Sequence, residues 1–233
     1  MTAEFPYTTI DLTHTLEETT PSWEGVCGFK SEIMLDYEQC PGAVAFRAQQ
    51  VHMHAGIGTH IDAPAHTEPG GITVDKIGLE NLIRPCVCID VSAKRQDDYV
   101  VSPDDILLFE KKHGRINEKS FVIVYTGWDA YWKEPARYHN NYMFPSISTE
   151  AASLLCDRNI AGIGIDTLSP DVPSSGFAVH KQLLGLGKYI VENVANAHLL
   201  PPVGAFVLVL PVKAAGLTEA PVRLVGLVNL HAE

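Results

Sequence analysis

Short apolar segments that alternate with helices restrict the fold of this chain more than any other feature. Residues 85–91 form a continuous apolar segment, of the kind that is buried on both faces of a sheet. Residues 121–126 and 160–166 indicate two further buried strands. Because strands that alternate with helices are joined by crossover connections, residues 102–166 predict parallel strands.

Two helices separate these strands, and each has a recognisable start. Ser102 is a good N-cap and is followed by a proline and two acidic residues, so we expect a helix that runs to about His113 and ends at Gly114. Ser148 begins a second amphipathic helix, which we expect to end near Asp157.

The two ends of the chain differ from this central part. Residues 8–13, 29–36 and 43–54 predict strands of antiparallel character, with a Pro-Gly turn at residues 41 and 42. Two further core strands are expected near the C-terminus, at residues 205–210 and 222–228. No repeat, low-complexity segment or linker interrupts the sequence. Residues 1–233 therefore predict one α/β domain with a mixed β-sheet.

Composition excludes several classes of function. The 233 residues are 46% hydrophobic and 19% charged, as in an ordinary globular protein. The net charge of −11 argues against binding to nucleic acid, which requires a basic surface. No apolar run is long enough to cross a membrane, the N-terminus lacks the features of a signal peptide, and the five scattered cysteines predict no disulfide framework. We expect a cytoplasmic protein.

The stretch from Gly58 to His66 carries the strongest chemical signal. His60 and Asp62 are two residues apart, so in an extended backbone both side chains point to the same side. An imidazole and a carboxylate on one face can hold zinc or manganese. Pro64 should end the strand and turn the chain, which leaves His66 free to face the same site. The spacing alone also permits packed, hydrogen-bonded core residues.

A second pair of polar residues lies further along the chain. Glu192 ends a short apolar strand, where a buried carboxylate is costly unless it is paired or bound to a metal. His180 opens an expected helix, from which a neutral imidazole can face inward. Twelve residues separate the two, which is too far for a local motif.

Both stretches resemble the cyclase family of metal-dependent hydrolases, which includes bacterial kynurenine formamidase and isatin hydrolase. The family pattern His-x-Gly-Thr-His-x-Asp-x-Pro-x-His is matched from Gly58 to His66, and the family segment Val-Glu-x-Leu/Val-Ala-Asn is matched at residues 191–196. Matches extend from about residue 10 to about residue 228. The first histidine of the pattern is missing, because Gly56 stands in its place and the nearest histidine is His54.

The resemblance implies a fold and a set of site residues. The fold would be a barrel-like β core with helices packed outside, of the swivelling β/β/α type seen in kynurenine formamidase. The metal ligands would be His60, Asp62, His180 and Glu192, and Trp23 would form a wall of the substrate pocket. Trp23 is equally well explained as an aromatic lid on the core.

Three features of the site stay open at the level of sequence. Without the first histidine we expect one zinc or manganese ion per chain, and His54 is the candidate ligand if a second ion binds. The resemblance also implies a homodimer or homotetramer. The aromatic segment 131–145 suits either a lid or a subunit contact.

The function that these residues favour is metal-dependent hydrolysis of an amide C–N bond in a small molecule, such as an aryl formamide, a lactam or an imide. The metal would activate water, and His66 would carry the proton to the leaving nitrogen. One alternative is a family member that binds a small molecule without catalysis, because Gly56 replaces a ligand. Another is a structural metal site, although such sites are usually rich in cysteine and this set contains none.

Overall fold

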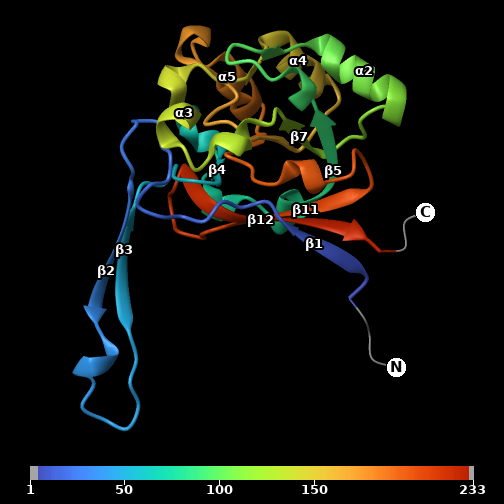
Figure 1. Ribbon diagram of the computed structural model, residues 1–233. Coiled ribbons are helices and arrows are strands. Elements are labelled where there is room, and N and C mark those ends of the chain that lie inside the picture. The colour runs from blue at the N-terminus through green and yellow to red at the C-terminus, as the bar shows by residue number, and fades with distance from the viewer. Residues whose placement is uncertain (1–4, 231–233) are drawn as a thin grey trace.

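The central feature of the computed structural model, which describes residues 5–230, is a mixed β-sheet that closes on itself (Figure 1). The strands are β1 (Tyr7–Asp11), β2 (Phe29–Leu35), β3 (Ala48–Met53), β4 (His60–Asp62), β5 (Ile83–Asp90), β6 (Val100–Val101), β7 (Phe121–Tyr125), β8 (Ser146–Ile147), β9 (Gly162–Ile165), β10 (Tyr189–Glu192), β11 (Ala205–Pro211) and β12 (Glu219–Asn229). The main sheet has the order β1-β12-β11-β5-β7-β9-β10-β4. Because β12 also pairs with β4, the sheet forms a barrel.

The direction of the strands follows the expected division of the chain. Strands β5, β7, β9 and β10 are parallel to one another, as the helix–strand alternation predicts. Strands β4, β11 and β12 pair antiparallel with their neighbours. The expected mixed α/β fold with a barrel-like core is confirmed.

The longer helices lie on one side of the barrel, over its parallel strands (Figure 1). The helices are α1 (Leu79–Leu82), α2 (Pro103–His113), α3 (Pro135–His139), α4 (Thr149–Asp157) and α5 (Ala178–Gly185). The side chains of Ser102 and Asp105 form a capping box at the start of α2, and the hydroxyl of Ser148 accepts a hydrogen bond from the amide of Ala151 at the start of α4. The expected bounds of these two helices are confirmed. Among the described residues, no helix has the length and apolar character needed to cross a membrane.

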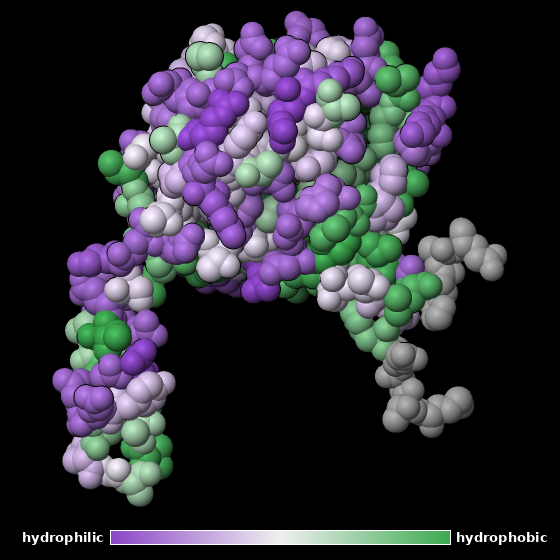
Figure 2. Space-filling model, in the orientation of Figure 1, coloured by the Kyte–Doolittle hydropathy of each residue, from purple (hydrophilic) through white to green (hydrophobic). Residues whose placement is uncertain are grey.

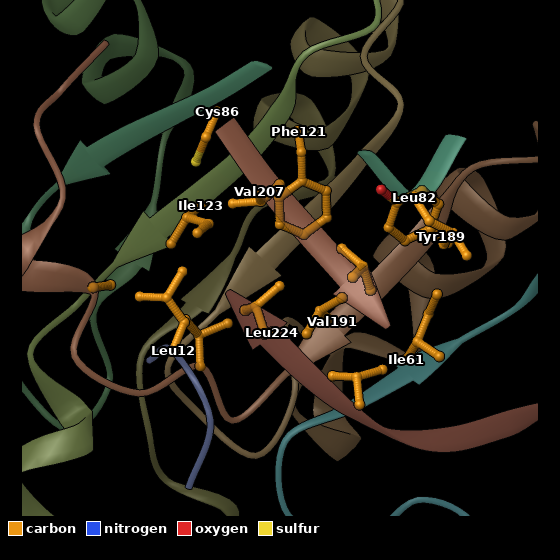
Figure 3. Close-up of a cluster of buried hydrophobic side chains, with 14 of the residues drawn as sticks. Leu12, Ile61, Leu82, Cys86, Phe121, Ile123, Tyr189, Val191, Val207 and Leu224 are labelled. Carbon is orange, nitrogen blue, oxygen red and sulfur yellow. The ribbon is translucent and has the colours of Figure 1, made fainter. Parts of the chain in front are cut away.

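Apolar side chains form separate cores on the two sides of the barrel wall. The interior of the barrel is filled by side chains that include Leu12, Ile61, Phe121, Val191 and Leu224 (Figure 3). A second apolar cluster lies outside the wall, where α2, α4 and α5 pack on the parallel strands. Because neighbouring residues of a strand face opposite sides, the inward positions of Ile61 and Val191 direct the residues beside them to the outer face.

Strands β2 and β3 form an antiparallel hairpin that is separate from the barrel. The hairpin extends away from the body of the protein as an arm (Figure 1). The prediction of two strands around the turn at residues 41 and 42 is confirmed, although β3 begins at Ala48 rather than at residue 43. Since β3 and β4 belong to different sheets, His54 does not share a strand with His60.

Candidate active site

Two barrel strands and one helix bring four predicted site residues together. His60 and Asp62 flank the inward-facing Ile61 in β4, so both point to the outer face of the barrel. Strand β10 pairs with β4 and places Glu192 opposite His60. His180 reaches the same point from α5. All four polar side chains are buried.

The two imidazoles face different oxygens of the two carboxylates, at distances typical of metal ligands. Nε2 of His60 lies 3.5 Å from Oδ1 of Asp62 and 3.4 Å from Oε2 of Glu192. Nε2 of His180 lies 3.5 Å from Oδ2 of Asp62 and 3.3 Å from Oε1 of Glu192. Ligand atoms placed about 2.1 Å from a tetrahedral ion would be about 3.4 Å apart.

The second nitrogen of each imidazole is held by a hydrogen bond. Nδ1 of His60 donates to the carbonyl oxygen of Gly58 at 2.8 Å. Nδ1 of His180 donates to the carboxylate of Asp171 at 2.8 Å. These bonds hold a proton on each Nδ1 and turn both Nε2 atoms toward the carboxylates. Histidines that bind metals are commonly fixed in this way.

The carboxylate of Asp62 provides the test of whether a cation fits. Asp62 is only 1% exposed, and neither of its oxygens has a hydrogen-bond partner. A buried carboxylate without partners is costly, because it has lost the hydrogen bonds that it makes with water. A divalent cation among the surrounding donors would satisfy both oxygens. The residues present therefore fit a metal ion.

The electrostatics of the cluster also favour positive charge. Burial opposes the charged form of His60, but the carboxylates of Asp62 and Glu192 outweigh it and raise the pKa of this imidazole to about 10. Burial also opposes the charged form of His180, yet its hydrogen bond to Asp171 and the nearby carboxylates of Asp62 and Glu192 raise its pKa well above the ordinary value. Both imidazoles thus lie in a strongly negative potential, which a bound cation would neutralise.

His66 lies beside the cluster, in the turn that Pro64 begins. The centre of its ring is 6.0 Å from that of His180, and its side chain is 33% exposed. Nδ1 of His66 lies 3.3 Å from Oε2 of Glu219. This contact, which outweighs the opposing effect of burial, raises the pKa of His66. His66 thus lies beside the cluster and remains partly open to solvent.

A pocket of about 470 Å³ opens beside the cluster, and this volume is typical of a site for a small molecule. Trp23, Leu168 and Phe177 line its apolar side. The ring of Trp23 also packs on Tyr142 at 4.6 Å and on Phe177 at 5.7 Å between centroids. The two explanations for Trp23 are therefore compatible, since it lines the pocket and packs on other aromatic rings. His54 lies at the pocket too, but its side chain is 58% exposed and belongs to neither candidate metal group of the described residues.

Comparison with known proteins agrees with this geometry. Residues 10–172 match the Cyclase family model, described as "Putative cyclase". The chain belongs to the Cyclase family. Kynurenine formamidase from Bacillus mycoides (strain KBAB4) is 27% identical over 225 residues, which cover 93% of this chain and 95% of that protein.

Two solved structures of isatin hydrolases are similar to this Cyclase-family chain over almost their whole length. Isatin hydrolase A from Labrenzia aggregata, bound to benzyl benzoate, has 31% identity and a TM-score of 0.86 over 96% of this chain and 94% of that chain. An isatin hydrolase bound to the product analogue thioisatinate has 25% identity and a TM-score of 0.86 over 96% of this chain and 93% of that chain.

Sequence reasoning missed three residues that shape this Cyclase-family site. Asp171 holds Nδ1 of His180, and Glu219 contacts His66. Asn193 ties the two motif stretches together, because its side-chain amide donates to the carbonyl of Gly58 at 2.9 Å. The site partner of each, which is His180, His66 or Gly58, lies nine or more residues away along the chain. Only the position of Asn193, directly after Glu192, gave a signal.

Proposed function

We propose that this Cyclase-family protein is a metal-dependent amidohydrolase that cleaves the C–N bond of a small aryl formamide, lactam or imide. The observation that carries the proposal is the buried carboxylate of Asp62, whose two unpartnered oxygens face the Nε2 atoms of His60 and His180. The relationship to isatin hydrolase and kynurenine formamidase supports an amide or lactam as the substrate.

The ligands of the metal would be His60, Asp62, His180 and Glu192. Two imidazoles and two carboxylates suit zinc or manganese. An ion bound there would lower the pKa of water toward neutrality and polarise a carbonyl oxygen. Asp171 and the Gly58 carbonyl keep the two imidazoles in the tautomer that presents Nε2 to the ion.

His66 would carry the proton in this reaction. Its Nδ1 faces the carboxylate of Glu219, which leaves Nε2 available for substrate and water. The imidazole would accept a proton from the attacking water and donate it to the leaving nitrogen. The nearby negative charge of Glu219 stabilises the imidazolium that forms between these two steps.

The pocket would accept a flat, partly aromatic substrate. Trp23 and Phe177 offer apolar ring faces, while the polar cluster forms the opposite wall. The segment 131–145 packs against the loop that carries Trp23. The hydroxyl of Tyr142 in this segment donates a hydrogen bond to the carbonyl oxygen of Trp23 at 2.9 Å. A protein that only binds a ligand would have no evident use for a proton carrier such as His66 beside the cation.

We propose that the protein forms a homodimer or homotetramer through the β2–β3 arm. Hydrophobic side chains project from this arm into solvent (Figure 2), and Val44 and Phe46 are 74% and 56% exposed. A single two-stranded hairpin is only marginally stable in water. A second copy of the chain would bury these side chains. Val44→Asp together with Phe46→Asp should then reduce the mass measured by analytical ultracentrifugation, and an unchanged mass would exclude the arm as the contact.

Turnover assays test the enzymatic proposal. The protein, supplied with Mn²⁺ or Zn²⁺, should hydrolyse at least one member of a panel of formanilides, fused lactams and cyclic imides. Asp62→Ala should abolish this activity together with ion binding. Tight binding of panel compounds without turnover in the presence of either metal would contradict the proposal and favour the binding protein.

A further inference from the structure

Glu219 reaches the polar cluster from a strand that the sequence motifs do not include. It is the first residue of β12, and the pairing of β12 with β4 sets it opposite Asp62. Its neighbour Ala220 faces the interior of the barrel, so the carboxylate of Glu219 points to the outer face, as Asp62 does. The side chain is 25% exposed at the edge of the pocket.

The carboxylate of Glu219 occupies the space beside Gly56. A Cβ atom built on Gly56 would lie 2.2 Å from Oε1 of Glu219 and 3.4 Å from Nε2 of His60. Gly56 does not belong to the glycines with positive φ. Gly56 therefore leaves room beside His60, and this room is filled by an oxygen that can bind a cation.

Two groups of donors share Asp62. One consists of Asp62, His180 and Glu192, and the other of His60, Asp62 and Glu219. In each group the donor atoms lie within 4.8 Å of one another. Since Asp62 is buried and both of its oxygens lack hydrogen-bond partners, one oxygen is available to each group. A carboxylate that is shared in this way is suited to bridge two ions.

We propose that Glu219 is a ligand of a second divalent cation, which it holds together with His60 and Asp62, while Asp62, His180 and Glu192 hold the first. Because Nε2 of His60 has a single lone pair, His60 would bind the second ion and not the first. This inference rests on the proposed function, because Asp62 would bridge the second cation to the first. It replaces the expectation of a single ion, and it assigns the added ligand to Glu219 rather than to His54. Oε2 of Glu219 would keep its contact with His66, while Oε1 binds the cation.

Titration of the metal-free protein with Mn²⁺ tests this assignment, with calorimetry to count sites and electron paramagnetic resonance to detect coupling between ions. The wild type should bind two ions and show the spectrum of a coupled pair. Glu219→Gln should weaken the second ion at least about tenfold, remove the coupled spectrum and leave the first ion unchanged. Glu24→Gln is the matched control, since it removes the same charge from the same pocket, and it should bind as the wild type does.

A second variant removes no carboxylate. Gly56→Ala would place a methyl group where Oε1 of Glu219 lies, so it should also weaken the second ion. If the wild type and Glu219→Gln both bind a single ion with equal affinity, Glu219 only positions His66 and the inference is wrong. If the wild type binds no ion, the proposed function fails together with it. If Glu219→Gln and Gly56→Ala both bind two ions as the wild type does, the assignment of Glu219 is wrong, while the proposed function is unaffected.

Discussion

Replacement of Asp171 by asparagine tests how the protein prepares His180 to bind a cation. The buried carboxylate accepts four hydrogen bonds. One oxygen accepts from the hydroxyl of Ser175 and the amide of Val179, and the other accepts from the amide and Nδ1 of His180. Asparagine has a single acceptor oxygen, which would face His180, so its NH₂ group would meet the amide of Val179.

Two effects of Asp171→Asn follow from this geometry. Loss of the charge behind His180 makes Nε2 a weaker ligand, so the affinity for Mn²⁺ should fall about 10- to 100-fold. The unpaired buried amide of Val179 should lower the free energy of unfolding by about 1–3 kcal/mol. Isothermal titration calorimetry and urea denaturation measure the two effects separately.

Asp166→Asn is the matched control for this experiment. Asp166 is equally buried and accepts hydrogen bonds from Thr126 and Trp128. Its replacement should destabilise the fold without changing the affinity for Mn²⁺. An affinity in Asp171→Asn equal to that of the wild type would refute the argument that Asp171 prepares His180 for a cation.

Further predictions concern the proton carrier, the pocket wall and the stability at acid pH. His66→Ala should lower kcat by about 10²- to 10⁴-fold in steady-state assays while calorimetry shows unchanged ion binding, and unchanged turnover would remove His66 from the mechanism. Trp23→Ala should raise KM more than it lowers kcat, and an unchanged KM would mean that Trp23 does not contact the substrate. Burial against Trp132 lowers the pKa of His14 to about 4, below its ordinary value of 6.5. As the pH falls, His14 therefore binds a proton in the unfolded chain before it does so in the folded protein. The contribution of His14 to the free energy of unfolding should be fully present above pH 6.5 and decline by up to about 3 kcal/mol as the pH falls to 4. Denaturation of His14→Phe between pH 7 and pH 4 should show a smaller decline, and an equal decline would contradict this origin.

The parts of the structure that depend on local sequence could be predicted. His60 and Asp62 share a face because side chains alternate along any strand, and this holds whatever the strand pairs with. The starts of α2 and α4 follow from the caps at Ser102 and Ser148. The parallel strands follow from the order of helices and strands along the chain.

The parts that depend on distant pairing could not be predicted. Glu219 reaches Asp62 only through the register between β12 and β4, which closes the barrel. From the sequence, Gly56 indicated the loss of a ligand, whereas the structure places the carboxylate of Glu219 in the space beside it. The sequence also did not predict that the β2–β3 arm leaves the body of the protein. Residues 43–54 look like a strand that continues into the motif, whereas β3 and β4 belong to different sheets.

Anomalous diffraction from crystals grown with Mn²⁺ tests the central claim most directly. We predict a strong anomalous peak between Nε2 of His180 and the carboxylates of Asp62 and Glu192, where an ion would contact an unpartnered oxygen of Asp62. Crystals of Asp62→Ala grown in the same way should lack this peak. Wild-type crystals that show no peak at Asp62, or show manganese only at surface carboxylates, would contradict the metal centre and the function built on it.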